Sequence, residues 1–477
     1  MMPGVHEVDV TPMDPERLVP FLRSDRAEEF RTIVERGRRR FAGRTVWNVS
    51  STAAGGGVAE MLHRLVRYAK GAGVDSRWVV IDGTADFFAV TKRLHNRLHG
   101  EEGDNGELGD RERQLSQDVV ADNAGPLMDL LAPEDIVLVH DPQPAGLLPV
   151  LRDRGIVAVW RCHVGTETTN EWTDDAWAFL RPSVETAAAT VFSRAEYVPA
   201  WVPHDKVRII PPAIDPLSAK NQPLDDHAVL AILGRAGIVD HSGDGAEFVD
   251  TDDRRRTVEL TANVRRVGSP LSPDVPVLLQ VSRWDRLKDM SGVLRAFVDG
   301  AVGGETGAHL FLVGPDVTGV TDDPEGKQVL DECVAMWEQL PAATRATASL
   351  ISLPMDDLEQ NAAIVNALQR HAAAVAQKSL REGFGLTVAE AMWKARPVIG
   401  SAVGGIQDQV RDGVDGLLIS DPHDLGAFAS AARTLLGDRA SADRMGSAAH
   451  ERVRDNFLAD RDLGQWTNLL GDLAVGD

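Results

Sequence analysis

The sequence predicts an α/β protein with two domains, each built on a parallel sheet wrapped by helices. Short β-branched apolar runs alternate with longer amphipathic stretches along almost the whole chain, a pattern typical of parallel sheets. This series occurs once in each half of the chain. At 477 residues the chain also exceeds the size at which one hydrophobic core usually stops growing. Ligand-binding loops are then expected at the carboxyl ends of the strands, in a cleft between the domains.

The predicted strands are runs of apolar and β-branched residues that lie between turn residues. In the first half they are 45–49, 78–81, 136–140, 157–160, 190–193 and 207–210. In the second half they are 277–282, 309–313, 350–353, 373–376, 398–400 and 417–419. A helical pattern over 18–40 precedes the first strand, and a second one over 445–470 forms a long tail.

The expected domain boundary lies between Val267 and Pro276, where turn residues occur without an apolar period. The resulting expected parts are an acceptor-side domain at 1–270, a donor domain at 271–450, and a helical tail at 451–477 that crosses back to the first domain. Two polar stretches, 100–109 and 240–256, are predicted to be surface insertions or mobile loops.

Charge and cysteine content exclude several classes of partner. With 50 basic and 72 acidic residues the formal net charge is −22, which argues against nucleic-acid binding and against attraction to anionic membranes. Cys162 and Cys333 are the only cysteines, so a disulfide framework is excluded and a cytoplasmic location is expected. Neither a secretory signal nor an apolar run of about eighteen residues, the length that spans a bilayer, is visible.

Residues 378–392 form the strongest candidate binding site. Gly383 and Gly385 let the backbone approach a ligand closely, and the loop leads into a helix whose first N–H groups favour an anion. Glu382 and Glu390 are better suited to accept hydrogen bonds from sugar or ribose hydroxyls than to bind phosphate. The pattern indicates a nucleotide-sugar site, and an ordinary loop and helix with two solvated glutamates is the alternative.

Two cations follow the first strand of the second half. Arg283 and Lys288 lie at a strand end that faces the expected cleft, where they could clamp a diphosphate from one side. The alternative is that they form surface ion pairs with Asp285 and Asp289.

Glycines follow two other predicted strands. Gly55, Gly56 and Gly57 occupy a strand-to-helix junction and allow a phosphate to approach backbone N–H groups, although a flexible turn is an equal alternative. Their spacing matches neither a P-loop nor a dinucleotide-binding fingerprint. Gly404 and Gly405 again place bare backbone near the cleft.

Histidines close two strands of the first half. His140 follows one strand, and His163 follows Arg161 and Cys162 at the end of another. A histidine there can donate to or accept from a sugar hydroxyl, while a core or supporting histidine is the alternative for each. No second histidine or carboxylate stands at a metal-ligand spacing, so no metal is predicted. Nucleophilic catalysis finds no support, because the chain has no GxSxG and Cys162 has no activating neighbour beyond His163.

Taken together, these residues make the chain resemble the retaining glycosyltransferases of family 4, which have the two-domain GT-B fold, along nearly its full length. Glu382 and Glu390 match the E-x7-E motif of that family. Arg283 and Lys288 match its donor-diphosphate pair, and Gly55–Gly57 its N-terminal glycine loop. Within the family the likeness is greatest to the trehalose synthases, which join nucleotide-activated glucose to free glucose. The segments that carry this likeness are 46–49, 55–62, 140–144, 160–163, 211–218 and 377–394.

The resemblance implies a role for each candidate residue. Glu390 would hold the ribose hydroxyls of the donor and Glu382 its sugar hydroxyls. Arg283 and Lys288 would neutralise the departing diphosphate without a metal. His163 would contact the donor sugar near its primary hydroxyl. Further donor contacts would come from Gly383, Phe384, Gly385, Leu386, Gly55, Gly56, Gly57, Gly404 and Gly405, and acceptor contacts from Asp141, Gln143 and Arg161.

The function that the resemblance implies is transfer of glucose from an NDP-glucose, such as ADP-glucose or UDP-glucose, to glucose, with retention of configuration, to form trehalose. No cofactor or metal is expected, and the partners are the donor and a sugar acceptor. Segment 165–175 and the insertion near Asp240 depart from what the resemblance implies. A different acceptor, a trehalose phosphorylase and a non-catalytic sugar-nucleotide-binding regulator therefore stay open. The donor base and the oligomeric state, a homodimer included, are not revealed by the sequence.

Overall fold

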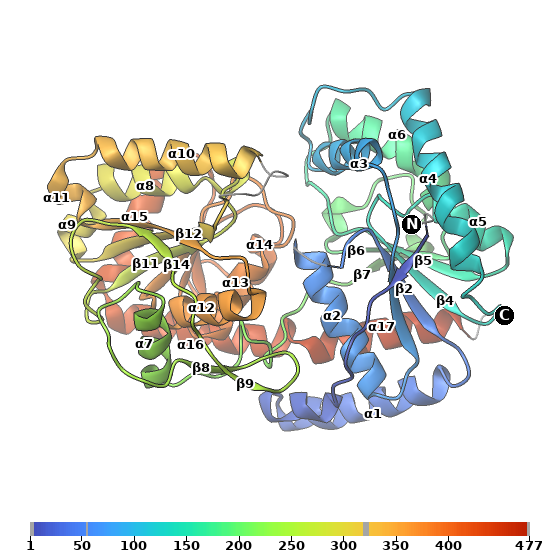
Figure 1. Cartoon of the computed structure of the whole chain (residues 1–477), viewed down its shortest axis with the longest axis horizontal. Coiled ribbons are helices and arrows are strands. Elements are labelled where there is room, and N and C mark those ends of the chain that lie inside the picture. Colours follow the sequence, from blue (N-terminus) through green and yellow to red (C-terminus); the bar gives the residue numbers. More distant parts are fainter. Residues whose placement is uncertain (1–3, 54–55, 318–323, 475–477) are drawn as a thin grey trace. The chain divides into compact units, whose positions relative to one another are not determined.

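The structure is a computed structural model that describes residues 4–53, 56–317 and 324–474. It divides into two compact units. The first comprises Met1–Ala213 and Ala459–Asp477, and the second comprises Ile214–Leu458. Each unit is an α/β domain with its own sheet (Figure 1). Within the described part of the chain, every helix is too short or too polar to cross a bilayer.

The first unit is built on a seven-stranded sheet. Its strands are β1 (His6–Glu7), β2 (Val46–Ser50), β3 (Ser76–Val80), β4 (Ile136–His140), β5 (Val157–Arg161), β6 (Ala189–Phe192) and β7 (Val207–Ile209). They lie in the order β1-β3-β2-β4-β5-β6-β7, and all neighbours are parallel except β1 and β3. Every strand predicted in the first half is present, whereas β1, a two-residue edge strand, was not predicted.

Helices cover both faces of this sheet. They are η1 (Pro15–Phe21), α1 (Ser24–Arg40), α2 (Gly56–Gly71), α3 (Ala85–Leu98), α4 (Asp110–Met128), α5 (Leu147–Asp153), α6 (Glu171–Val184), η2 (Ala195–Tyr197), η3 (His204–Lys206) and α17 (Ala459–Leu473). The helices α3 to α6 lie on one face, and α1, α2 and α17 on the other (Figure 1).

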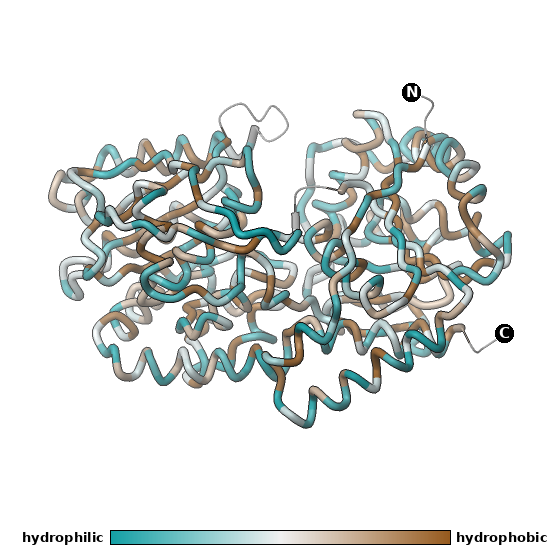
Figure 2. Tube along the Cα trace, turned by 60° about the horizontal axis from the view of Figure 1, so that its bottom comes forward, coloured by the Kyte–Doolittle hydropathy of each residue, from teal (hydrophilic) through white to brown (hydrophobic). Residues whose placement is uncertain are grey.

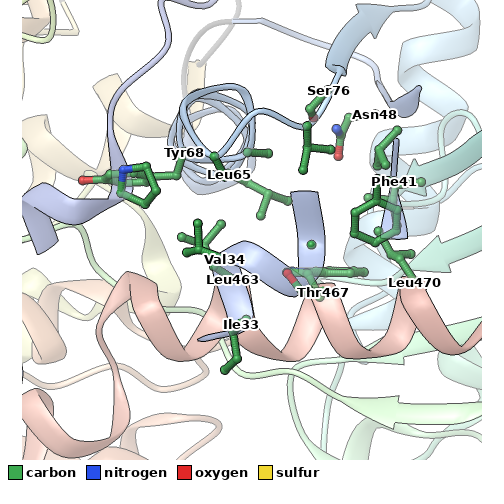
Figure 3. Close-up of a pocket in the computed structure, with 18 of the residues that line it drawn as sticks. Ile33, Val34, Phe41, Asn48, Leu65, Tyr68, Ser76, Leu463, Thr467 and Leu470 are labelled. Carbon is green, nitrogen blue, oxygen red and sulfur yellow. The ribbon is translucent and has the colours of Figure 1, made fainter. Parts of the chain in front are cut away.

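Helix α17 completes the core of the first unit, although it follows the second unit in the chain. Trp466, Leu469 and Leu470 recur at helical spacing on one side of the helix and are buried in one cluster with Val46 and Leu65. Figure 3 shows α17 beside an apolar cavity of about 60 Å³ in this part of the core. The helix is therefore a structural part of the first unit.

The second unit also contains a seven-stranded sheet, together with a separate hairpin. Its strands are β8 (Glu247–Val249), β9 (Arg255–Thr257), β10 (Asn263–Arg265), β11 (Val277–Val281), β12 (His309–Pro315), β13 (Ala348–Leu353), β14 (Ala374–Gln377), β15 (Val398–Ser401) and β16 (Gly416–Ile419). The sheet order is β10-β13-β12-β11-β14-β15-β16, parallel except at the edge strand β10. All strands predicted in the second half are present.

Helices again lie on both faces of the sheet. They are α7 (Asp226–Arg235), η4 (Arg286–Lys288), α8 (Met290–Asp299), α9 (Val302–Thr306), α10 (Pro324–Gln339), α11 (Ala342–Arg345), α12 (Leu358–His371), α13 (Leu386–Trp393), α14 (Ile406–Gln409), α15 (Leu425–Gly437) and α16 (Arg439–Asn456). Helices α8, α10 and α15 share one core with the sheet, while α7, α12, α13 and α16 cover the other face (Figure 1). Figure 2 shows hydrophobic residues gathered inside each unit and hydrophilic ones along its outside.

The domain boundary predicted near residue 270 lies inside the second unit. Helix α7 packs on α12, and β10 pairs with β13, so the residues before 270 belong to this unit. The amide of Asn366 also donates to the carbonyl oxygens of Ala219 and Gln222, at 3.0 Å each. The turn-rich segment 268–274 is thus a connection between two strands of one sheet.

The polar stretch 240–256, predicted as an insertion or mobile loop, contains most of a hairpin with defined contacts. Strands β8 and β9 pair antiparallel. The side-chain amide of Gln222 donates to the carbonyl of Val249 at 2.8 Å and accepts from its N–H at 3.0 Å. Arg256 forms an ion pair with Asp357 at the start of α12. These contacts fix the hairpin to the second unit.

The other polar stretch, 100–109, links α3 to α4 and is also held by α3. Arg97 is buried and its Nη2 donates to the carbonyl of Gly106 at 2.6 Å. Nη2 of Arg93 donates to Asp104 at 2.9 Å. The acidic surplus of this stretch is therefore partly neutralised by neighbouring arginines.

Candidate functional site

In the second unit, a candidate site forms at the carboxyl ends of β11 and β14. These strands are parallel neighbours, so the segments that follow them meet. Lys288 follows β11 and Glu382 follows β14. Nζ of Lys288 lies 2.7 Å from each carboxylate oxygen of Glu382, and the two side chains are only 15% and 10% exposed. The predicted phosphate-binding cation and sugar-binding carboxylate are thus a direct ion pair.

Two polar residues to which the sequence analysis gave no role hold the carboxylate of Glu382. The hydroxyl of Ser379 donates to Oε2 at 3.0 Å, and the amide of Gln377 donates to the same oxygen at 3.4 Å. Gln377 also donates to the hydroxyl of Ser379 at 3.0 Å. In the sequence, only their position pointed to such a role, since Gln377 is the last residue of the buried strand β14 and Ser379 follows that strand. Together they fix the direction of the carboxylate.

A second buried group joins the loops that carry Lys288 and Glu382. Lys378 is fully buried, forms an ion pair with Asp289 and donates to the carbonyl of Pro422 at 2.7 Å. The side chain of Gln280 accepts from the N–H of Lys378 at 3.0 Å and donates to the carbonyl of Lys288 at 2.7 Å. These contacts make the two loops one rigid support. Lys378 lies in the predicted segment 378–392 but was given no role there, and Gln280 was not predicted to take part in the site.

The structure also brings together the glycine-rich residues of the second unit. They are Gly383, Phe384, Gly385, Leu386, Gly404 and Gly405. Gly385 has φ +82° and precedes the first residue of α13. A Cβ on Gly405 would lie 2.7 Å from the Cα of Phe384, so only glycine permits this approach. The amide of Gln409, another residue that was not predicted, donates to the carbonyl of Phe384 at 2.6 Å.

Arg283 and Glu390 have other partners. The side chain of Arg283 is 67% exposed and its Nη2 lies 2.8 Å from Asp285, which is the ion pair proposed as an alternative. Glu390 is buried on α13 and lies 3.6 Å from Nζ of Lys220. The structure therefore joins Lys288 to Glu382 and leaves the roles of Arg283 and Glu390 as predictions.

In the first unit, the carboxyl ends of β4 and β5 bring two histidines together. Nδ1 of His140 lies 3.2 Å from Nε2 of His163, and the rings stack with centroids 5.5 Å apart. The N–H of His163 donates to Oδ1 of Asp141 at 2.8 Å. Asp141 has φ +68°, and the indole of Trp160 donates to its carbonyl at 3.0 Å. His140 is therefore the buried, supporting histidine. His163 is half-buried and is the outer histidine of the pair.

Burial sets the charges of this cluster. Burial, together with the neighbouring Arg161, lowers the pKa of His140 to about 3. Burial and Arg161 also hold the pKa of His163 well below its usual range. Burial raises the pKa of Asp141 to about 6, against the opposing effects of the His163 N–H and Arg161. Both histidines are thus neutral at physiological pH.

Arg161 and Gln143, predicted to contact an acceptor, lie deeper than expected. Arg161 is 1% exposed, and its Nη2 donates to the hydroxyl of Ser193 at 3.0 Å. Its Nε and Nη1 have no hydrogen-bond partner among the described residues, nor has Oε1 of the half-buried Gln143. Burial lowers the pKa of Arg161 to about 10. Acceptor contact by Arg161, Gln143 and Asp141 stays a prediction.

Of the predicted N-terminal glycine loop, Gly55 lies outside the described residues. Gly56 begins helix α2 and Gly57 lies in its first turn. Over the described ranges, no group of three or more histidine, cysteine, aspartate and glutamate residues could hold a metal ion.

A hollow of about 700 Å³ lies beside the segment that follows His163. Gly165, Thr166 and Thr169 form one wall, and Trp177 and Trp201 line another. The two indole rings meet edge to face with centroids 6.0 Å apart. The segment 165–175, whose sequence departs from the resemblance, therefore borders this hollow.

Comparisons with known proteins identify the family. A family model described as the N-terminal domain of trehalose synthase matches residues 48–199, and one for glycosyl transferases group 1 matches residues 358–452. A trehalose synthase from Pyrococcus horikoshii is 35% identical over 448 residues, which are 94% of this chain and 94% of that protein. A trehalose phosphorylase from Pleurotus pulmonarius is 26% identical, over 88% of this chain and 56% of that protein.

The fold agrees with these matches. The solved structure of a UDP-forming trehalose-phosphate synthase from Burkholderia xenovorans aligns with a TM-score of 0.66 at 16% identity, covering 91% of this chain and 100% of that chain. Neighbours of this kind are GT-B glycosyltransferases, and both units have the α/β architecture of that fold. The chain is a glycosyltransferase with the GT-B fold and belongs to the trehalose synthase family.

Proposed function

We propose that this enzyme transfers glucose from a nucleoside diphosphate glucose to free glucose with retention of configuration, and thereby forms trehalose. The observation that carries the proposal is the ion pair of Lys288 and Glu382 beside the glycine-rich start of α13. A cation, a carboxylate and the N-terminus of a helix in one place suit a ligand that has both phosphates and hydroxyls.

The ion pair supports a division of labour in the reaction. Lys288 and Glu382 neutralise each other in a largely buried position. A diphosphate would draw the Lys288 ammonium toward itself, and Glu382 would then accept hydrogen bonds from the sugar hydroxyls. Negative charge grows on the diphosphate as the glycosidic bond breaks, so a cation held nearby stabilises the transition state more than the ground state.

Arg283 is suited to a second contact with the diphosphate. Its guanidinium is largely exposed and forms an ion pair with Asp285, which also follows β11. The Asp285 carboxylate is 15% exposed and is also held by the N–H of Leu287 at 2.8 Å, so a phosphate would reach the guanidinium from its exposed side. Glu390 would take the ribose hydroxyls, and the acceptor hydroxyl would attack from the face that the diphosphate leaves.

A donor and acceptor screen tests the proposal. The enzyme is incubated with ADP-, UDP- or GDP-glucose and with glucose, and the products are analysed by mass and anomeric configuration. Trehalose with a retained donor anomer is expected from at least one donor. Absence of a disaccharide from every donor contradicts the proposal, and an inverted product contradicts its stereochemistry.

A transferase with a larger acceptor is the second candidate. The hollow beside segment 165–175, about 700 Å³ in volume, has room for more than one sugar ring, and its lining begins at Gly165, two residues after His163. Glucose, glucose phosphates and disaccharides are therefore included as acceptors in the same screen. Phosphate-dependent breakdown of trehalose without added nucleotide would instead indicate a trehalose phosphorylase.

A further inference from the structure

Four neighbouring strands of the first unit each supply one polar group to a chain of hydrogen bonds that ends at His163. The amide nitrogen of Asn48 on β2 donates to the carbonyl of Arg77 on β3 at 3.3 Å. Oδ1 of Asn48 lies 3.1 Å from Nε2 of His140 at the end of β4. Nδ1 of His140 lies 3.2 Å from Nε2 of His163, which follows β5.

The donor and the acceptor in each of these hydrogen bonds can be assigned, starting from the carbonyl of Arg77. A backbone carbonyl only accepts, so the Asn48 amide must turn its nitrogen to Arg77 and its oxygen to His140. That oxygen also only accepts, so Nε2 of His140 carries a hydrogen. His140 is neutral, and its Nδ1 therefore accepts from a hydrogen on Nε2 of His163. His163 is neutral as well, which leaves its Nδ1 without a hydrogen.

We propose that Asn48 and His140 are positioning residues that hold His163 in the Nε2–H tautomer and present its Nδ1 as a hydrogen-bond acceptor for a sugar hydroxyl. Nδ1 of His163 makes no hydrogen bond to the described residues, and the side chain is only half-buried. The sugar ligand itself rests on the proposed function, whereas the tautomer is a property of the protein alone. His163 thus accepts from a ligand and does not donate to it.

The surroundings leave the chain without competing partners. Asn48 and His140 are 0% and 1% exposed, so water does not offer alternative hydrogen bonds. On its other side Asn48 borders the apolar cavity, where Figure 3 shows it near Phe41 and Ser76. Arg161 is the charged residue that acts on both histidine rings, and Oδ1 of Asp141 accepts from the backbone N–H of His163. Arg161 favours neutral rings, which the assignment requires.

Nitrogen NMR on the intact, ligand-free enzyme tests the assignment directly. The protein is labelled with ¹⁵N-histidine, and the signals of the two rings are assigned with the single variants His140→Gln and His163→Ala. Both rings are expected to be neutral Nε2–H tautomers from pH 5 to pH 8. A hydrogen on Nδ1 of either ring, or protonation of either ring in this range, overturns the proposal. This result does not depend on the donor, so it stands apart from the sugar screen.

A double-mutant cycle tests the positioning role. His140→Leu removes both hydrogen bonds, whereas His140→Gln keeps an amide oxygen for His163 and an amide N–H for Asn48. We expect kcat/KM to fall about tenfold in His140→Leu, the scale of one misdirected hydrogen bond, and to fall less than about threefold in His140→Gln. In a His163→Ala background, His140→Leu should have no further effect. An equal loss with and without His163 overturns the role, and so does a Gln variant as impaired as the Leu variant.

Discussion

The two candidate regions of this enzyme use opposite electrostatics. In the second unit, Lys288 and Glu382 are both charged and compensate each other at 2.7 Å. In the first unit, His140 and His163 are uncharged and linked by hydrogen bonds whose direction is set by Asn48. A charged pair can redistribute when a phosphate arrives, whereas a neutral chain can only orient. Phosphate chemistry is therefore expected to depend on the second unit and sugar orientation on the first.

The largest expected effect is that of Lys288→Ala. Loss of the cation leaves the developing diphosphate charge unmatched and Glu382 without its partner, so kcat should fall about 10²- to 10³-fold. Steady-state kinetics with a saturating donor measure this loss. Arg286→Ala is the matched control, because Arg286 lies in the same turn but pairs with Glu332 at the surface. Similar losses in both variants would contradict a specific role for Lys288.

Gly405→Ala tests the backbone half of the charged site. The added methyl would lie 2.6–2.8 Å from the ring, Cα and carbonyl oxygen of Phe384, so the loop before α13 must move. We expect stability to fall by about 1–3 kcal/mol, as for other overpacked positions, and kcat/KM to fall by roughly one to two orders of magnitude. Denaturant unfolding and kinetics check both values. Gly437→Ala is the control, because no atom lies within 4 Å of its Cβ position.

Arg283→Ala should have a smaller effect than Lys288→Ala. Its side chain is 67% exposed, against 15% for Lys288, and water and salt screen an exposed charge. We expect the KM for the donor to rise about tenfold, with a difference from wild type that shrinks at high ionic strength. A loss equal to that of Lys288→Ala would show that Arg283 is ordered and desolvated when the donor binds.

Asp141→Asn tests the neutral region through its pH dependence. The raised pKa of Asp141, about 6 against an ordinary 3.8, means that folding disfavours the ionised carboxylate. The stabilising protonated form is lost as pH rises from about 4 through 6, so the variant should be the more stable protein at pH 8 by roughly 1–3 kcal/mol and equal to wild type near pH 4. Asparagine tolerates the positive φ and keeps an oxygen for the N–H of His163.

Urea unfolding of both proteins across this pH range measures the difference, in which the histidine contributions cancel. Asp153→Asn serves as the control, because the side chain of Asp153 is 67% exposed at the end of α5 and lies 2.7 Å from that of Arg152. A variant that is less stable than wild type at pH 8 would contradict the assignment of a disfavoured carboxylate at Asp141.

The sheets could be predicted from the sequence because their strands are buried on both faces. Runs such as Ile136–His140 and Val277–Val281 are almost wholly apolar and stand between turn residues. The short strands β8, β9 and β10 could not be predicted, because each has three residues and partly exposed polar side chains. The boundary was misplaced for a related reason, since the turn residues at 268–274 resemble a linker but join β10 to β11.

The types of residue in the site could be predicted from the sequence, whereas the contacts between them could not. Glu382 and Lys288 stood out by spacing and charge, yet their pairing spans 94 positions and depends on the adjacency of β11 and β14. Asn48 lies in segment 46–49, but no role could be assigned to it, because a single polar residue inside an apolar strand has many structural uses. The same holds for Gln280 in β11, and Lys378 gave no sign of its partner Asp289, which lies 89 positions away. Their roles exist only once strands distant in sequence lie side by side.

The place of α17 in the first unit has a consequence for biosynthesis. The ribosome completes the whole of 214–458 before it makes the helix that carries Trp466, Leu469 and Leu470. At roughly 5–20 residues per second, the first unit then waits for tens of seconds with the apolar side of β2 and α2 uncovered, while the second unit can already fold. The half of the enzyme that begins first would therefore mature last, and a nascent chain stalled before α17 should be a substrate for chaperones.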